Sequence, residues 1–238
     1  MQLRALSLIA ALMLAGPVLA QTRAAPAAAA NWAQQVALTP AGGVQIGNPA
    51  AAVKIIEFGS LTCPHCKAFH ETGLAAIKAK YLATGRVSYE YRPFTLNGID
   101  LMAGLVMQCL AAPQALAFID RVYARQAEMV QPFQAISEAD RASLAALPPA
   151  AQGPRMAELG KLPEFVAAAG VPRARYDACI ASKPGEAKLL AIRKDAVQNH
   201  GLTGTPSFLI NGKMQADTYD WAALEPQLAA ALKATGTK

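Results

Sequence analysis

The stretch that decides the fold spans residues 53–66 and reads VKIIEFGSLTCPHC. Its first part, Val53–Phe58, is a short apolar run with Gly59 directly after it, which is typical of a strand buried on both faces of a sheet. Cys63-Pro64-His65-Cys66 follows at the start of a helical pattern. The stretch therefore predicts a strand that leads into a helix, with two cysteines at the junction.

The next segments extend this unit. Apolar residues recur at helical spacing over residues 66–83, and Gly85 is a suitable end for that helix. Residues 87–91 alternate and are rich in β-branched and aromatic side chains, so they predict a second strand. A strand–helix–strand order is typical of a βαβ unit with parallel strands. Residues 205–210 predict a further strand, and Asn211-Gly212 predicts a two-residue hairpin turn.

Residues 99–185 differ in pattern, because they are rich in Ala and Leu and are interrupted by prolines. We expect an inserted set of short helices, one of them at 137–147 with Ser137 as N-cap and Asp140 as its partner. The other expected elements after the first unit are a helix at 188–199, a strand at 213–215 and a closing helix at 220–232 capped by Asp220. The predicted fold class is α/β, with residues 44–98 and 186–238 as two halves of one domain around the insertion.

The N-terminal residues predict export. Met1–Arg4 carries one positive charge, Ala5–Leu14 is a continuous apolar run, and small residues follow up to Ala20. This pattern indicates a cleavable signal peptide at residues 1–20. The run is shorter than the roughly 20 residues of a spanning helix, although a permanent N-terminal anchor is the alternative. Residues 21–43 are expected to be a flexible lead-in, with one or two helical turns around 31–38.

Charge and cysteine content narrow the class of protein. The formal net charge is +6, but the basic residues are scattered, so we expect no nucleic-acid partner. The chain has four cysteines. In an exported protein an even number of cysteines indicates an oxidising compartment and disulfides, with three possible pairings for four cysteines.

The cysteine pair predicts redox chemistry. Cys63 falls at the N-terminus of the expected helix, where free backbone N–H groups and the helix dipole stabilise a thiolate. Pro64 suits the first turn because it lacks an N–H, and a protonated His65 would add positive charge. Cys66 lies one turn further on and should face inward. We expect Cys63 to form a mixed disulfide with a partner protein and Cys66 to attack and resolve it. A stabilised Cys63 thiolate makes the disulfide form an oxidant.

Other interpretations of this motif are a purely structural disulfide and a metal site. Cys63, Cys66 and His70 would supply three ligands, but a structural zinc site needs a fourth, and the sequence has no second Cys or His pair to supply it. Covalent haem attachment requires His directly after the second cysteine, where this chain has Lys67. We therefore expect neither a metal nor a cofactor.

Two segments resemble a known family. Glu57–Cys66 is similar to the active-site segment of the DsbA-like thiol oxidases of the thioredoxin superfamily, and Gly204–Gly212 is similar to their cis-proline loop. The resemblance follows the order of elements over most of residues 44–235 and is weak inside the insertion. It implies a thioredoxin-like fold with an inserted helical domain.

The resemblance also implies roles for three residues. Pro206 would follow a cis peptide bond, and Thr205 would face the cysteines and offer backbone groups to an extended substrate. Glu57 would be a buried acid beneath Cys66 that relays protons to and from its sulfur. From the residues alone, Glu57 equally suits a solvent-facing position at a strand edge.

The remaining cysteines, Cys109 and Cys179, both fall in the predicted helical insertion. We predict a structural disulfide between them, which would close a loop of about 70 residues and stabilise the fold by roughly 4–5 kcal/mol in the chain-entropy model. The alternative is two separate buried thiols.

The expected function is that of a monomeric periplasmic disulfide oxidase, a protein disulfide oxidoreductase that oxidises cysteine pairs in exported proteins. The family implies a membrane partner of the DsbB kind, linked to quinones, that reoxidises it. A disulfide isomerase or reductase on the same fold is the first alternative, since Thr205 before Pro206 also resembles isomerase relatives. A peptide-binding, chaperone-like domain with a structural Cys63–Cys66 bridge is the second.

Overall fold

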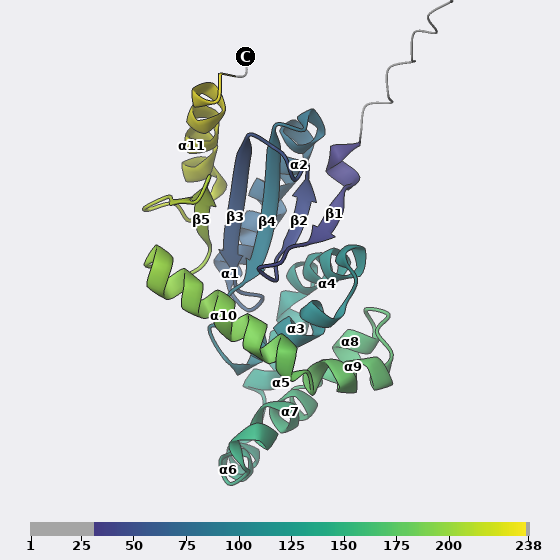
Figure 1. Ribbon diagram of the computed structural model, residues 1–238. Coiled ribbons are helices and arrows are strands. Elements are labelled where there is room, and N and C mark those ends of the chain that lie inside the picture. The colour runs from purple at the N-terminus through teal and green to yellow at the C-terminus, as the bar shows by residue number, and fades with distance from the viewer. Residues whose placement is uncertain (1–30, 237–238) are drawn as a thin grey trace, which may run out of the picture. The chain divides into compact units, whose positions relative to one another are not determined.

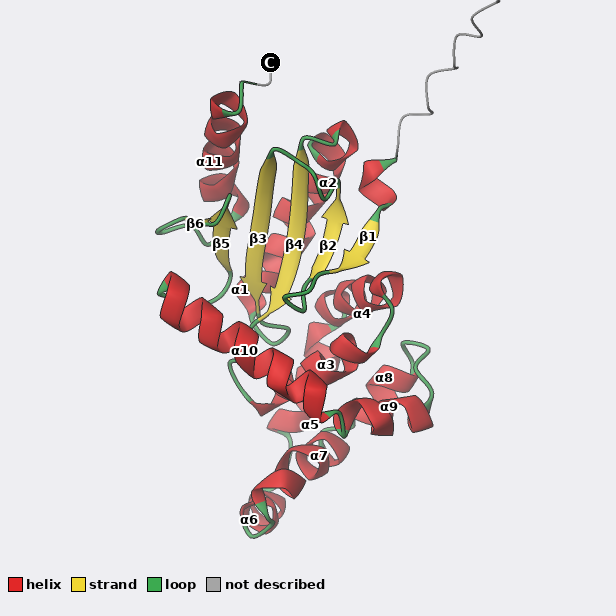
Figure 2. Cartoon of the chain, viewed as in Figure 1, coloured by secondary structure: helices red, strands yellow, loops and turns green. Residues whose placement is uncertain are grey.

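A computed structural model describes residues 31–236, in which a mixed β-sheet is flanked by helices (Figures 1 and 2). The signal peptide predicted at residues 1–20 and the first part of the lead-in lie outside the described residues. The sheet has six strands in the order β1-β2-β4-β3-β5-β6. Their bounds are Val36–Leu38 (β1), Val44–Gly47 (β2), Val53–Gly59 (β3), Val87–Pro93 (β4), Ser207–Ile210 (β5) and Lys213–Met214 (β6).

The two central strands, β3 and β4, pair in parallel, as the strand–helix–strand pattern predicted. Their register joins Val53 to Val87 at one end and Gly59 to Pro93 at the other. All other neighbouring pairs are antiparallel. Because parallel strands end at the same edge of a sheet, the residues after Gly59 emerge beside the end of β4. This edge carries the two cysteines.

The helix predicted at 66–83 starts earlier and is not uniform. It consists of α1 (Pro64–Phe69), a π-helical turn η2 (His70–Leu74), α2 (Ala75–Lys80) and a 3-10 turn η3 (Leu82–Thr84). Together they lie behind the sheet in Figure 1. Phe69 anchors this helix, because its ring packs on that of Phe208 in β5 at 4.5 Å between centroids. Closing helix α11 (Trp221–Ala234) starts after Asp220, whose side chain accepts a hydrogen bond from Ala223 N as predicted for its N-cap.

Eight helices follow between β4 and β5 in the described part of the chain, which places an all-helical segment where the insertion was predicted. The prediction of Ser137 as an N-cap is confirmed, since its Oγ accepts from Asp140 N at 3.1 Å. The boundary expected at residue 186 lies inside the last of these helices, which begins three residues earlier after the N-cap Ser182. The helices are α3 (Gly98–Cys109), α4 (Ala112–Ala124), α5 (Gln126–Gln134), α6 (Glu138–Ala145), α7 (Pro149–Leu159), α8 (Leu162–Ala167), α9 (Arg173–Ile180) and α10 (Lys183–His200).

One covalent bond links two helices of the helical segment that are far apart in sequence. Cys109, the last residue of α3, forms a disulfide with Cys179 in α9, with 5.5 Å between the Cα atoms. This is the pairing expected from the sequence. The bridge spans 70 residues of sequence and so holds the first of these helices against the seventh.

The segment before β2 is more ordered than the sequence suggested. In place of a flexible lead-in with helical turns up to residue 38, the chain forms one 3-10 turn (Trp32–Gln34) and then strand β1, which pairs with β2. A three-residue edge strand is too short to show a period-two pattern. Trp32 covers Gly85, which adopts a left-handed conformation (φ +69°) just before β4.

The hairpin turn predicted at Asn211-Gly212 joins β5 to β6, and both residues have positive φ (49° and 78°). Such a pair of angles is the reason why Asn-Gly is favoured in two-residue hairpin loops. The Asn211 side chain also accepts from Lys54 N at 2.8 Å, so the turn is tied to β3.

Candidate active site

The two cysteines of the CPHC motif lie where β3 gives way to α1. Cys63 has extended backbone angles (φ −81°, ψ 123°) and is the N-cap of α1, whose first residue is Pro64. Both thiols are free. Cys63 keeps 8% of its surface exposed and Cys66 none, so of the two cysteines only Cys63 retains solvent-accessible surface.

The loop before β5 supplies the opposite wall of this site. Cys63 Sγ lies 3.3 Å from the carbonyl oxygen of Thr205, and in its protonated form the thiol donates a hydrogen bond to that oxygen. The Thr205–Pro206 peptide bond is cis, as the resemblance implied, and Pro206 is buried. The structure thus brings together two segments that are 142 residues apart in the chain.

The surroundings separate the acidities of the two thiols. The pKa of Cys63 is lowered from 9.0 to about 5, first by the hydrogen bond from the Cys66 thiol, then by Thr205 and by the backbone N–H groups of Cys66 and His65, against the opposing effect of burial. Burial, the hydrogen bond with Cys63 and the charge of Glu57 raise the pKa of Cys66. At neutral pH the site therefore holds a Cys63 thiolate beside a protonated Cys66.

Glu57 is inside the protein and not at a solvent-facing strand edge. Only 1% of its surface is exposed, and its Oε2 accepts a hydrogen bond from the Tyr89 hydroxyl on β4. Burial raises the pKa of Glu57 from 4.5 to about 8, although the bond from Tyr89 opposes this shift. Its other oxygen, Oε1, has no hydrogen-bond partner among residues 31–236. Near neutral pH the Glu57 carboxyl group is therefore largely protonated.

Side chains that sequence reasoning missed hold the loop between β3 and α1. They come from β4, α4 and α5, and each donates a hydrogen bond to a loop carbonyl. The bonds run from Tyr91 Oη to Gly59 O (2.9 Å), from Tyr123 Oη to Ser60 O (3.1 Å), and from Gln126 Nε2 to Leu61 O (2.9 Å) and Cys63 O (3.0 Å). No local signal reveals these contacts, because up to 65 residues separate the partners.

The other candidate residues of the motif take simpler positions. Pro64 and His65 are exposed at the start of α1. His70 pairs with Asp120 on α4 at 2.8 Å, with its ring against Tyr123. Within the described residues no group of three or more His, Cys, Asp or Glu side chains is arranged to hold a metal ion.

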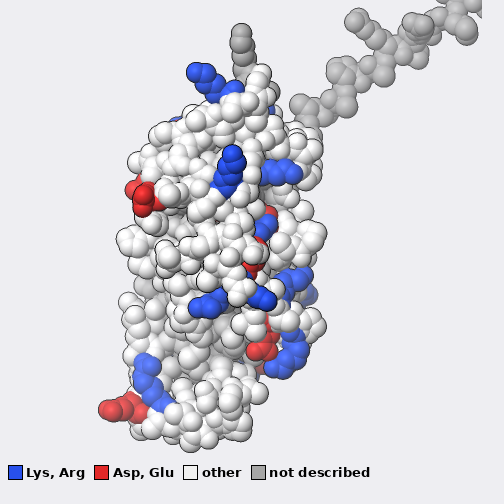
Figure 3. Space-filling model, turned by 60° about the vertical axis from the view of Figure 1, so that its left-hand side comes forward, with Lys and Arg blue, Asp and Glu red and all other residues white. Residues whose placement is uncertain are grey.

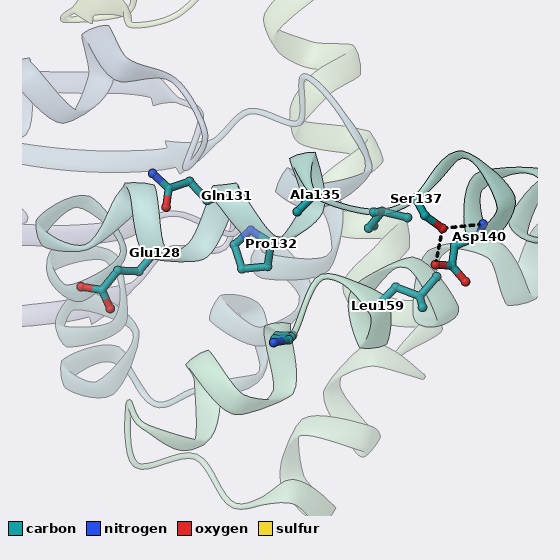
Figure 4. A pocket seen from close by; sticks show the side chains of 9 residues that line it. Glu128, Gln131, Pro132, Ala135, Ser137, Asp140 and Leu159 are labelled. Carbon is teal, nitrogen blue, oxygen red and sulfur yellow. Dashed lines mark hydrogen bonds between the residues drawn. The ribbon is translucent and has the colours of Figure 1, made fainter.

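Two surface features lie apart from this site. A cavity of about 630 Å³ between α5, α6 and the α7–α8 turn is shown in Figure 4. Two of its polar lining groups, Ser137 and Asp140, hydrogen-bond to each other at the start of α6. Lysine and arginine side chains are spread over the face seen in Figure 3 and do not form a single stripe. No helix in residues 31–236 has the length and apolar character needed to cross a membrane.

Comparison with known proteins shows the family. Residues 39–230 match the family model described as thioredoxin. A crystal structure of a protein-disulfide isomerase from Novosphingobium aromaticivorans is 31% identical, covers 79% of this chain and 96% of its own, and has a TM-score of 0.74. The alpha-DsbA1 of Wolbachia pipientis, 21% identical over 80% of this chain and 91% of its own, shares the fold with a TM-score of 0.62.

A curated relative from Rickettsia prowazekii, which carries the name of a protein-disulfide oxidoreductase, is 28% identical over 73% of this chain and 56% of its own length. The chain thus spans about half the length of the curated relatives it matches. The fold agrees with these matches. The chain therefore belongs to the thioredoxin family.

Proposed function

We propose that this protein is a thiol:disulfide oxidoreductase that donates the Cys63–Cys66 disulfide to cysteine pairs of exported proteins. The observation that carries the proposal is the contrast between the two sulfurs. Cys63 retains a small exposed surface and its pKa is lowered to about 5, whereas Cys66 is fully buried and its pKa is raised. A stabilised thiolate favours the dithiol form, so the disulfide form is a strong oxidant.

The proposed reaction passes through a mixed disulfide. A substrate thiolate attacks Cys63 Sγ, so that a bond to the substrate sulfur forms, the Cys63–Cys66 bond breaks, and Cys66 leaves with the electron pair and takes up a proton. A second substrate thiolate then attacks the substrate sulfur of the mixed disulfide and releases Cys63 as a thiolate. Two electrons move from substrate to protein, and the substrate's two thiol protons end on Cys66 and in solvent. In the reverse direction Cys66 is the nucleophile that resolves the mixed disulfide.

Glu57 is proposed to relay the proton that Cys66 takes up. With a pKa of about 8 it is largely protonated at neutral pH and can give that proton to the departing sulfur. Thr205 and Pro206 are proposed to bind the substrate. The Thr205 carbonyl oxygen lies 3.3 Å from Cys63 Sγ, next to the reacting sulfur, and suits an extended peptide.

The reaction also requires a partner that reoxidises the cysteine pair and a suitable compartment. Once reduced, the pair needs an oxidant, and we assign this role to a quinone-linked membrane protein of the DsbB kind. Disulfide donation requires an oxidising compartment, so we place the protein in the periplasm, as a monomer. The second candidate function is isomerisation, favoured by the 31% identity to a structure named as a protein-disulfide isomerase.

The first test is the reduction potential of Cys63–Cys66, measured by equilibration with glutathione buffers and counting of free thiols by alkylation. The variant Cys109→Ser/Cys179→Ser removes the second disulfide from the count. A potential well above that of thioredoxin, about −270 mV, is the expected result, and one at or below that value contradicts the oxidase. Cys63→Ser should abolish redox turnover; peptide binding without any turnover in the unchanged protein would instead indicate a chaperone-like domain.

A further inference from the structure

A buried carboxylate lies directly behind the active-site loop. Asp100, in the first turn of α3, is only 3% exposed. Within residues 31–236 no Lys, Arg or His forms an ion pair with it that would offset the cost of burial. Burial raises the pKa of Asp100, which reflects this cost.

All the hydrogen bonds that Asp100 accepts come from two loops at the site. Three donors belong to the segment just before Cys63, and the fourth is a backbone N–H from the loop after β4. The bonds run to the carboxylate from Ser60 Oγ (2.9 and 3.0 Å), Thr62 N (3.0 Å), Thr62 Oγ1 (3.2 Å) and Leu96 N (3.0 Å). Asp100 therefore holds the loop and is not itself in contact with either sulfur.

Ser60 connects this carboxylate to the redox pair. While its hydroxyl donates to Asp100, its backbone N–H donates to Cys66 Sγ at 3.4 Å. Its carbonyl oxygen accepts from Cys63 N at 3.2 Å. A displacement of Ser60 would therefore disturb both cysteines: it would remove an N–H donor from the sulfur of Cys66 and would release the backbone of Cys63.

We propose that Asp100 is a positioning residue for the redox reaction, which rests on the function proposed above. Its carboxylate fixes Ser60 and Thr62, so that Ser60 N–H stays directed at Cys66 and Cys63 stays at the N-terminus of α1 while the pair alternates between disulfide and dithiol. The stabilisation of the Cys63 thiolate depends on that placement, because the backbone N–H groups that favour it belong to the first turn of α1.

The test compares Asp100→Asn with Asp140→Asn. Both residues are the third residue of a helix, both donate their N–H to the N-cap side chain, and both accept from a serine hydroxyl. The two substitutions thus remove the same charge from the same helix position, but only Asp100 contacts the loop. We expect Asp100→Asn to shift the glutathione equilibrium about tenfold toward the disulfide form, which is about 30 mV for a two-electron couple. Asp140→Asn should shift it less than twofold.

Ser60→Ala separates the effect of positioning from the effect of charge. It removes the hydrogen bonds from the Ser60 hydroxyl to Asp100 but leaves the Asp100 carboxylate in place. Positioning predicts that Ser60→Ala moves the equilibrium in the same direction as Asp100→Asn and that both raise the pKa of Cys63. If Asp100→Asn moves the equilibrium the other way and Ser60→Ala has no effect, Asp100 acts only through its charge and the proposal is wrong. If Asp100→Asn does not fold, the shift of the equilibrium in Ser60→Ala alone tests the positioning role.

The result is independent of the proposed function. If the unsubstituted protein has a potential at or below that of thioredoxin, the oxidase proposal fails, but the ratio between variant and unsubstituted protein still measures positioning. Equal shifts in Asp100→Asn and Asp140→Asn would overturn the role of Asp100 whatever the absolute potential is.

Discussion

Individual atoms around Cys63 and Cys66 decide which sulfur reacts with a partner. Cys63 and Cys66 are three residues apart in the sequence, but their environments shift the pKa values of the two thiols in opposite directions. Hydrogen bonds from Cys66, Thr205 and the first turn of α1 stabilise negative charge on Cys63, while enclosure by the core disfavours it on Cys66. The same enclosure leaves Glu57 as a neutral acid over much of the neutral range.

The thiolate of Cys63 gives the first prediction. In the reduced protein, the ultraviolet absorbance of one thiolate should appear with a midpoint near pH 5, because the pKa of Cys63 is lowered to about that value. Alkylation of Cys63 should follow the same curve. Cys66→Ala removes the largest cause of the shift and should move the midpoint upward. A midpoint near 9 in the unsubstituted protein would contradict this account of the site.

Glu57 gives a prediction about stability and pH. Its pKa rises from 4.5 to about 8 on folding, so the folded state binds the proton more tightly. Glu57 therefore favours the folded state below about pH 4.5, and this contribution is lost as pH rises through 8. The free energy of unfolding of Glu57→Gln, compared with that of the unsubstituted protein at the same pH, should therefore rise by on the order of 4 kcal/mol from pH 4.5 to pH 8.

Denaturant unfolding at pH 4.5 and pH 8 measures this difference. Glu128→Gln is the control, since Glu128 lies on the surface of α5 with 54% of its side chain exposed. Equal pH dependence in Glu57→Gln and in the unsubstituted protein would mean that the buried carboxyl does not titrate in this range.

At the scale of helices and strands, the site depends on elements from both sides of the insertion. Strand β3 and helix α1 place the cysteines, the loop before β5 places Thr205, and α3, α4 and α5 supply the side chains that hold the loop. The disulfide between α3 and α9 stabilises this set from outside the site.

Removal of that disulfide should therefore affect stability more than chemistry. Cys109→Ser/Cys179→Ser should lower the free energy of unfolding by about 4–5 kcal/mol, since the bridge restricts a 70-residue loop in the unfolded chain. The measurement is denaturant unfolding of both proteins under oxidising conditions. The potential of Cys63–Cys66 should stay unchanged, and a loss of stability below about 1 kcal/mol would show that the bridge restricts little.

The elements differ in how far the sequence could predict them. Strands β3 and β4, their parallel pairing, the Asn211-Gly212 turn and the caps Ser137 and Asp220 were predicted, because each has a signal within a few residues. Strand β1 was missed, since three edge residues carry no readable pattern. Anchors such as Gln126 were missed because they act across 63 to 65 residues of sequence. Asn97, an N-cap with an acid at the third helical position, is the local signal that could have pointed to Asp100.

At the scale of the whole described unit, the site is formed by residues that lie far apart in the sequence. Residues that contact the cysteines or their loop extend from Glu57 to Thr205, so the site is complete only when the insertion has packed and β5 has joined β3. Local helix or hairpin formation alone cannot build it. Redox activity therefore reports on the packing of α4, α5 and the loop before β5 around the cysteines.

The positions of the two tryptophans have a practical consequence for optical measurements. Trp32 covers Gly85 before the start of β4, and Trp221 packs near Tyr81, with 6.2 Å between ring centroids, after the end of α2. The cysteines lie beyond the other end of β3 and β4, about 20 Å away for strands of this length. Neither indole is in contact with a sulfur that could quench it. Intrinsic tryptophan emission should therefore stay nearly constant between the disulfide and dithiol forms, while it will report unfolding well.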